Sequence, residues 1–372
     1  MVHCSIDRMI VAMQHPGTPS FLPLDGLGSV SRRRFGRWAA ASALPAAPAW
    51  ARVGAPGAPG PLRIALCSQA DLRFLPLTVA RELDYFAAEG LRVRFVEYAS
   101  TAQAMRAVGQ GAADVCGGAF EHVLRQQPDG QFWRSLVLLG RAPQLALVVA
   151  RRHWPVRGGA AIRQWRIGVA APRSASASLV HWWLDQQRVA LGDVRLVPVG
   201  VGRPALESLQ RGRVQALSHA DPVITMLEQR AQVRVLADAR TLKGTAEMFG
   251  GPMPGACLFA PEPYARQQGA EVQALVNALV RGLKWLQTAS PADLMRLVPA
   301  GHLLGDRAAY MAAFEKMRET LSPDGLMPQD GPATAWRTMA RLEPRLAGAE
   351  VRLAQTFSNE WALRAGQKIQ WA

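Results

Sequence analysis

The sequence has 372 residues, 49% of them apolar, and a mean hydropathy of +0.01, which exclude an intrinsically disordered chain and allow two domains with separate cores. Its 43 Lys and Arg against 28 Asp and Glu give a formal net charge of +15. The basic residues are scattered rather than gathered on one face with aromatics between them, so we expect no nucleic-acid partner but a mild preference for anionic ligands. No apolar run is long enough to predict a permanent membrane span.

The N-terminal 51 residues are predicted to be a twin-arginine signal peptide, which places the protein in the periplasm. Consecutive arginines at 32–34 precede a weakly apolar, Ala-rich stretch at 38–50. Small-x-small cleavage sequences occur within 47–51, and a Pro/Gly linker follows at 52–61. The alternative is a surface arginine cluster beside a helix, which the two prolines inside the Ala-rich stretch disfavour.

The remaining cysteines give no sign of a metal or redox site. Removal of the signal peptide also removes Cys4 and leaves Cys67, Cys116 and Cys257. Three is an odd number, and their spacing matches no zinc pattern. We therefore expect free, buried thiols and no cofactor.

From residue 62 onward, short apolar runs alternate with helical patterns. Strands are predicted at 62–67, 91–98, 113–119, 145–150, 166–170, 194–199, 214–218 and 233–237. Helices are predicted at 76–88, 102–110 (capped by Thr101), 120–127, 174–188, 204–211 and 222–230, with an almost wholly helical chain after 271. This alternation is typical of parallel sheets that are covered by helices on both faces, here in two units.

Several segments, in this order, resemble one family. Leu62-Arg-Ile-Ala-Leu is followed by a helical sequence that ends Glu-Leu-Asp-Tyr-Phe-Ala-Ala-Glu-Gly90, with Asp84 where a glycine is usual. Gly109-Gln-Gly-Ala-Ala-Asp-Val115 and Gly212-Arg-Val-Gln-Ala-Leu217 precede later strands. These motifs are similar to those of the sulfonate-, taurine- and nitrate-type substrate-binding proteins of ABC importers, and the resemblance covers roughly residues 62–357.

The resemblance implies an α/β, type II periplasmic-binding-protein fold: two doubly wound lobes with a hinge and a helical C-terminal tail. Lobe 1 would comprise 62–143 and 240–372, and lobe 2 would comprise 144–239. Chain crossings near 141–145 and 237–241 would form the hinge. The protein would then be a monomeric solute-binding component that captures a small anionic or polar organic ligand between its lobes and presents it to a permease and ATPase.

Candidate ligand-binding residues follow the predicted strands, where the carboxyl ends of strands face the crevice. In chain order they are Ser68, Gln69, Asp71, Gly117, Gly118, Glu121, Ser174, Ser176, Ser178, His219 and Asp221. The alternating serines start a helix and favour an anion, although one of them could be an ordinary helix cap. Asp221 could equally cap the helix that follows it. Adjacent helical positions point about 100° apart, so we expect Glu121 and His122 to be solvated polar residues rather than a catalytic pair, although either could line the crevice.

Two other functions remain open. The thiamine-pyrimidine precursor synthases resemble this family, but their cysteine cluster is absent here. The sequence also contains no nucleophile elbow, dinucleotide-binding loop, phosphate-binding loop or zinc-binding helix motif, so an enzyme is unsupported. The second alternative is a ligand sensor that docks on a receptor instead of a permease.

Overall fold

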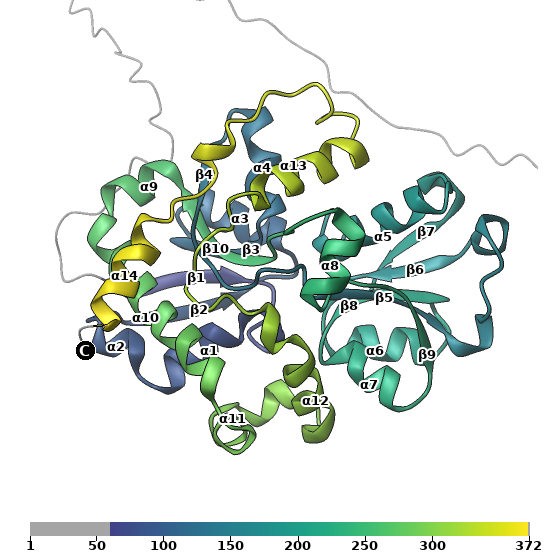
Figure 1. The fold of residues 1–372 in the computed structure, drawn as a ribbon, viewed down its shortest axis with the longest axis horizontal. Helices are drawn as coiled ribbons and strands as arrows, with labels where there is room; N and C mark the ends of the chain where they lie inside the picture. The colour runs from purple at the N-terminus through teal and green to yellow at the C-terminus, as the bar shows by residue number, and fades with distance from the viewer. Residues whose placement is uncertain (1–59, 371–372) are drawn as a thin grey trace, which may run out of the picture. The chain divides into compact units, whose positions relative to one another are not determined.

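Two five-stranded sheets organise the computed structural model, which describes residues 60–370 (Figure 1). The first has the order β2-β1-β3-β10-β4 and the second β7-β6-β8-β5-β9. The predicted signal peptide and most of the linker lie outside the described residues. Among residues 60–370, no helix combines the length and the apolar character needed to cross a membrane.

We call the part of the fold built on the first sheet lobe 1 and the part built on the second sheet lobe 2. The first sheet contains β1 (Leu62–Leu66), β2 (Val93–Glu97), β3 (Val115–Ala119), β4 (Trp133–Leu138) and β10 (Ala256–Pro261). The second contains β5 (Leu145–Ala150), β6 (Arg166–Val169), β7 (Arg195–Pro198), β8 (Ala216–Ala220) and β9 (Val233–Asp238). The helices are α1 (Leu75–Glu82), α2 (Tyr85–Ala88), α3 (Thr101–Gly109), α4 (Glu121–Gln126), α5 (Ala175–Gln186), α6 (Arg203–Gln210), α7 (Val223–Gln229), α8 (Leu242–Phe249), α9 (Glu262–Gln267), α10 (Gly269–Thr288), α11 (Pro291–Leu297), α12 (Arg307–Met317), α13 (Gly331–Leu342) and α14 (Glu360–Gln370).

Each sheet is mixed rather than purely parallel, because one strand runs against the others. In lobe 1 this strand is β10, which pairs antiparallel with β3 and β4. In lobe 2 it is β5, which pairs antiparallel with β8 and β9. Each is the first strand after a crossing between lobes, and each starts opposite the carboxyl end of a neighbour: Leu145 faces Ala220, and Ala256 faces Ala119. A strand that enters the sheet at the edge where its neighbours end has to run antiparallel to them.

Other differences from the sequence expectations are local. The helix predicted at 76–88 is interrupted at Asp84, which has φ 56, a left-handed conformation that Asp tolerates better than most residues. Ser100, and not Thr101, caps α3 by accepting a hydrogen bond from the Gln103 N–H. The strands β4 and β10 were not predicted. The helical chain after 271 is confirmed by α10 to α14.

The C-terminal helices hold both lobes. The helix α12 contacts α7 of lobe 2, and its Ala309 is buried in the lobe 2 core. On another side, α13 contacts α5 of lobe 2, where Arg341 pairs with Asp185 at 2.8 Å and lies over the Trp182 ring. The segment that follows the second crossing therefore reaches back across the gap between the sheets (Figure 1).

A buried ion-pair network fixes the second crossing. The Arg240 side chain is fully buried, and its guanidinium lies 2.7 Å from Asp238, 2.8 Å from Glu228 and 3.4 Å from Asp221. Burial opposes ionisation of Asp238, but the hydrogen bonds and charge of Arg240 outweigh it and lower the pKa of Asp238 to about 2. Lys316 of α12 also reaches Asp238, at 3.2 Å. The network thus ties the end of β9 to α7 and α12.

We expect Arg240→Met to lower the free energy of unfolding by about 3–5 kcal/mol, because it leaves the buried Asp221 carboxylate without its cation. Urea denaturation at neutral pH measures this. The matched control is Arg230→Met, which removes the half-exposed pair between Arg230 and Asp306 at 3.6 Å and should cost less than about 1 kcal/mol. Similar losses in the two variants would contradict a structural role for the network.

Candidate functional site

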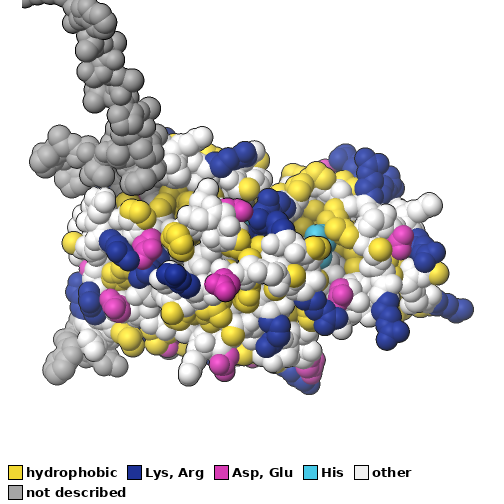
Figure 2. Space-filling model, turned by 90° about the horizontal axis from the view of Figure 1, so that it is seen from above, with side chains coloured by type: hydrophobic (Ala, Val, Ile, Leu, Met, Phe, Trp, Pro, Cys, Tyr) yellow, Lys and Arg dark blue, Asp and Glu magenta, His cyan; other side chains and the backbone are white. Residues whose placement is uncertain are grey.

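A pocket lies between the two lobes at the carboxyl ends of their strands, and we call it the cleft pocket. It encloses about 570 Å³ of space between the atoms, some of it continuous with solvent. Seen from above, the molecule is hollowed between the lobes, with hydrophobic side chains around the hollow (Figure 2). The residues that line the cleft pocket are Cys67, Arg73, Phe74, Ala99, Ser100, Thr101, Gly118, Ala119 and His122 from lobe 1, and Leu145, Ala170, Ala171, Ser174, Ala175, Ser176, Val201, His219 and Ala220 from lobe 2.

Two helix N-termini face the cleft pocket, one from each lobe. Ser100 caps α3, and Ser174 caps α5 by accepting a hydrogen bond from the Ala177 N–H. The first-turn amides of these helices have no carbonyl partner within the helix, and the helix dipole adds a partial positive charge. The pocket therefore presents free N–H donors in a positive field from both sides, an arrangement that suits an anion.

The serines of α5 are held in place by backbone groups. Ser176 Oγ accepts a hydrogen bond from the Ala170 N–H at 2.9 Å and lies 2.9 Å from Ser174 Oγ. Ser174 Oγ also donates to the carbonyl of Ala171 at 2.7 Å. Two of the predicted serines thus brace the loop before α5, so that the first-turn amides point to a fixed place.

Arg73 supplies the full positive charge of the cleft pocket. Its Nε and Nη2 bind the carboxylate of Asp71, with Nη2 2.5 Å from Oδ2. In the described part of the chain, Nη1 of Arg73 has no hydrogen-bond partner. Burial opposes ionisation of Asp71, but Arg73 outweighs it and lowers its pKa, so the pair stays charged. Asp71 therefore orients the guanidinium and leaves one of its edges available to a ligand.

Two histidines line the cleft pocket in their neutral form. Burial and the nearby Arg125 lower the pKa of His122 to about 4. Burial also lowers the pKa of His219, although the carbonyls of Ala220 and Gly200 favour the proton. His219 Nδ1 lies 2.9 Å from the Ala220 carbonyl, which makes Nδ1 the protonated nitrogen, while its buried Nε2 has no hydrogen-bond partner. The cleft pocket thus contains an unused polar atom in addition to its donors.

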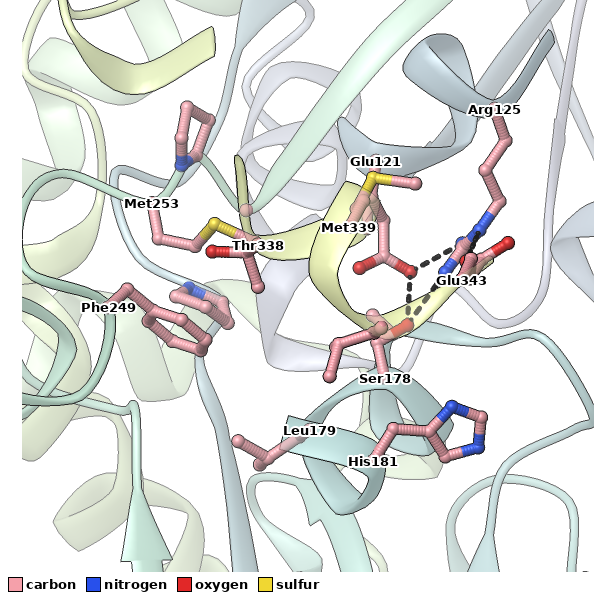
Figure 3. A pocket seen from close by; sticks show the side chains of 16 residues that line it. Glu121, Arg125, Ser178, Leu179, His181, Phe249, Met253, Thr338, Met339 and Glu343 are labelled. Atoms are coloured by element: carbon pink, nitrogen blue, oxygen red, sulfur yellow. Dashed lines mark hydrogen bonds and ion pairs between the residues drawn. The ribbon is translucent and has the colours of Figure 1, made fainter. Parts of the chain in front are cut away.

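A second cavity, the side pocket, adjoins the cleft pocket (Figure 3); it has about 530 Å³ of space between its atoms, part of which is open to solvent. The two cavities share Ala119 and Ala175. The side pocket is lined by Ala119, Glu121, Arg125, Pro143, Ala175, Ser178, Leu179, His181, Phe249, Met253, Pro254, Gly255, Thr338, Met339, Leu342 and Glu343.

Charged side chains at one end of the side pocket join the lobes. Arg125 binds Glu121 at 2.7 Å and Glu343 at 2.6 Å, both in lobe 1, and donates to Ser178 of α5 in lobe 2 at 2.8 Å. Ser178 Oγ in turn donates to Glu121 at 3.0 Å. Figure 3 shows these four side chains together, with Phe249, Met253 and Thr338 at the other end.

The structure brings six of the predicted site residues to these cavities. Gly118, Ser174, Ser176 and His219 line the cleft pocket, and Glu121 and Ser178 line the side pocket. The expectation that Glu121 and His122 are solvated is wrong, because their exposed fractions are only 5% and 6%. Arg125 neutralises Glu121 inside the protein, and His122 avoids the cost of burial by remaining neutral.

The other predicted residues have structural contacts and line neither cavity. Ser68 accepts a hydrogen bond from the Ala70 N–H, and the Gln69 side chain accepts one from Arg81. Asp71 acts on the cleft pocket only through Arg73. A Cβ on Gly117 would lie 3.2 Å from Phe74 and 3.3 Å from Leu258, so this glycine faces the core. Asp221 accepts hydrogen bonds from the Thr225 N–H and hydroxyl in the first turn of α7, besides its pairing with Arg240.

Sequence reasoning missed Arg73, Arg125 and the α13 residues of the side pocket. Arg73 lies two residues after Asp71. The two side chains form an ion pair because a short helical turn at Leu72–Phe74 brings them together. Thr338, Met339 and Leu342 come from far along the chain. Their helical spacing gave no signal beyond an ordinary apolar face.

The sequence profile of the NMT1/THI5 like family matches residues 71–292 of the chain. A solved protein of Bordetella bronchiseptica RB50 is 39% identical, with a TM-score of 0.80 over 84% of this chain and 98% of that one. The periplasmic aliphatic sulphonate binding protein of Escherichia coli is 19% identical, with a TM-score of 0.58 over 82% and 99%. The desulfurization enzyme DSZB is 18% identical, with a TM-score of 0.55 over 83% and 99%. No curated protein matches the sequence.

We expect His122 to make folding sensitive to acid between pH 6.5 and 4. The unfolded chain binds a proton near the ordinary pKa of 6.5, whereas the folded protein resists it down to about 4, so acidification favours unfolding. Between these pH values the wild type should lose up to about 3 kcal/mol more free energy of unfolding than His122→Asn. Urea denaturation across this pH range measures the difference, with the half-buried His153→Asn as control. Parallel curves for wild type and His122→Asn would refute the assignment.

Proposed function

The chain belongs to the NMT1/THI5 like family, and from this premise we propose that it is the solute-binding component of an ABC importer that captures a small organic anion in the cleft pocket. Periplasmic location, export by the twin-arginine route and action as a monomer are part of the proposal. The sulphonate-binding relative of the same fold is itself periplasmic, which supports the location. The permease and ATPase would be its partners.

One observation carries this proposal: two helix N-termini from different lobes and the guanidinium of Arg73 face the same pocket. An anion bound there contacts both lobes at once, so its binding energy favours closure. Both histidines are neutral, hence the charge selectivity comes from Arg73 and the helix dipoles and persists over the physiological pH range.

The contacts between lobes supply a physical basis for a closed form. Arg125 and Ser178 bridge α4 and α5 beside the ligand pocket. Opening the cleft would break this hydrogen bond and expose the charged side chains to water. A permease that recognises the surfaces of both lobes in this arrangement would distinguish the loaded protein from the empty one.

An enzyme is the second candidate, because DSZB has the same fold. Catalysis by a thiol would need a thiolate, and Cys67 is the cysteine among the residues that line the cleft pocket. Burial raises the pKa of Cys67 and outweighs its hydrogen bond with Thr101, so the thiol remains protonated and unreactive. The pocket chemistry therefore favours binding over turnover.

We expect the mature protein, starting at Arg52, to be stabilised by small organic monoanions in a thermal-shift screen of sulfonates and carboxylates. A ligand at about 100 times its dissociation constant adds about 2.7 kcal/mol, a shift of several degrees. The ligand should be recovered chemically unchanged after incubation with the protein. Turnover of the ligand would instead support the enzyme, and no stabilisation by any anion would contradict the proposal.

Replacement of Arg73 should weaken binding of the best monoanion strongly. Arg73→Gln removes a half-buried charged donor and should cost about 2–5 kcal/mol of binding free energy, while Arg73→Lys should retain part of it. The control is Arg63→Gln, which breaks a more exposed arginine–aspartate pair with Asp114 on lobe 1, outside both cavities, and should leave the dissociation constant unchanged. Isothermal titration calorimetry measures all three. Equal affinity in Arg73→Gln and Arg63→Gln would place the anion elsewhere.

A further inference from the structure

We propose that the end of lobe 2 farthest from the cleft binds an anionic phospholipid surface, through a cluster of exposed arginines and the indole of Trp154. We call this surface the distal face, and its central residues are Arg151, Arg152, Trp154, Arg166, Arg195 and Arg213. The inference goes beyond the proposed function, because the distal face shares no residue with the cleft pocket or the side pocket.

The topology of the lobe 2 sheet brings these arginines together from distant parts of the chain. The parallel strands β6, β7 and β8 end at the cleft, so their first residues lie at the opposite edge of the sheet. Arg166 begins β6, Arg195 begins β7, and Arg213 precedes β8. The antiparallel strand β5 ends at this same edge and is followed directly by Arg151 and Arg152.

Contacts at this edge show that the arginines are neighbours. Arg166 lies opposite Arg195 in the parallel pairing of β6 with β7. Nη2 of Arg166 donates a hydrogen bond to the carbonyl of Gly212 at 3.1 Å. A Cβ on Gly212 would lie 3.0 Å from Nη2 of Arg152, so this second guanidinium lies beside the same glycine. Several positive charges therefore share one small area of the surface.

Acidic neighbours do not neutralise the distal face. The segments 151–166, 188–195 and 211–213 contain nine arginines and one acidic residue, Asp193, which lies 3.8 Å from Arg163. In the part of the chain that the structure describes, none of the five arginines of the distal face forms an ion pair, and all five are exposed. Their mutual repulsion is relieved when an anionic surface approaches.

The corresponding edge of the lobe 1 sheet is built differently. There Arg63 of β1 pairs with Asp114 at 2.6 Å, and Arg134 of β4 pairs with Glu262 at 2.7 Å. The lobe 1 edge thus contains its own counter-ions, whereas the lobe 2 edge lacks them. Unpaired arginines are therefore a particular property of the distal face and not a general result of the basic composition.

Exposed apolar side chains beside the arginines favour a lipid surface over a purely ionic partner. Trp154 is 47% exposed, and Leu191, just before β7, is 46% exposed. The ring of His153 lies 6.0 Å from that of Trp165, at the start of the same sheet edge, and this contact holds the Trp154 loop there. At the level of lipid headgroups an indole ring is partly immersed while guanidinium groups attract the anionic phosphates.

Binding through the distal face would leave the cleft accessible. The strands β6 and β8 begin at the distal face and end at the cleft pocket, so the two sites lie at opposite edges of the lobe 2 sheet. In Figure 2 the lobe 2 end, on the right, has Lys and Arg side chains on its surface away from the hollow between the lobes. We therefore expect membrane binding and ligand binding to be independent.

The test is cosedimentation of the protein starting at Arg52, which retains every described residue, with lipid vesicles. Vesicles of phosphatidylcholine that contain about 30% phosphatidylglycerol should bind the protein at least about tenfold more tightly than vesicles of phosphatidylcholine alone. An increase in NaCl from about 0.05 M to about 0.5 M should remove most of this difference, because salt screens the exposed charges.

Two kinds of variant locate the contact. Arg151→Glu combined with Arg152→Glu should weaken binding to the anionic vesicles at least about tenfold. Arg195→Glu combined with Arg213→Glu should have a similar effect, which keeps the test available if the first pair folds poorly. Trp154→Ala should weaken binding about threefold or more, because it removes the apolar contact.

Matched controls lie on lobe 1. Arg94→Glu combined with Arg106→Glu makes the same change in net charge at two exposed positions, and Phe132→Ala removes a ring that is 43% exposed. Each control should change vesicle binding less than about twofold, because charges beyond a Debye length of the contact are screened. Arg73→Gln should bind vesicles as the wild type does, since the cleft pocket is separate.

Equal binding to neutral and anionic vesicles would overturn the inference, as would equal losses in the distal and lobe 1 double variants. Binding to soluble polyglutamate but not to the anionic vesicles would also overturn it, and would assign the distal face to an acidic protein. None of these results bears on the proposed function, which is tested separately by ligand binding in solution.

Discussion

The arrangement of the two lobes depends on one buried cation, the guanidinium of Arg240. It lies where the chain leaves lobe 2, and the carboxylates around it come from the end of β9, from α7 and from the residue before a cis proline, Asp221. The buried Arg240 and Asp221 pair with each other, and the partly exposed Glu228 and Asp238 complete the shell of the guanidinium. The network thereby fixes the direction in which the chain returns to lobe 1, and with it the position of α8, Met253 and the rest of the side pocket wall.

The charged groups of the cleft pocket differ from those around Arg240 in how completely they are paired. In the network around Arg240 every charged group has a partner, whereas in the cleft pocket Arg73 keeps one edge free and His219 retains an unpartnered nitrogen. The other titratable side chains of the wall carry no charge, because both histidines are neutral and Cys67 is protonated. The positive field of the pocket therefore comes from a few fixed sources, which is what selection for a monoanion requires. The charged side chains of the side pocket, by contrast, are all paired.

The sequence predicted the alternation of strands and helices and the serines at the start of α5, because each of these depends on local pattern and turn residues. It did not predict β4 and β10, whose neighbours in the sheet are distant in the chain. The role of Asp221 was left open between ligand and cap because its partner, Arg240, lies 19 residues away. Leu342 and Met339 carried an ordinary helical pattern, and only tertiary packing reveals that they line a cavity. Cavity-lining residues were thus predicted at some positions that follow a strand, whereas Arg73, Arg125 and the residues of the C-terminal helices were missed.

The reversed strand β5 also determines how lobe 2 is joined to the rest of the chain. Its first residues pair with the last residues of β9, with Ala146 opposite Asp238, so lobe 2 begins and ends at neighbouring points of one sheet. Topologically, it is a single cassette inserted into lobe 1 through two adjacent strands. Such a cassette can be exchanged between relatives at these two junctions, and recombination there would transfer the α5 half of the binding cleft while leaving the lobe 1 sheet uninterrupted.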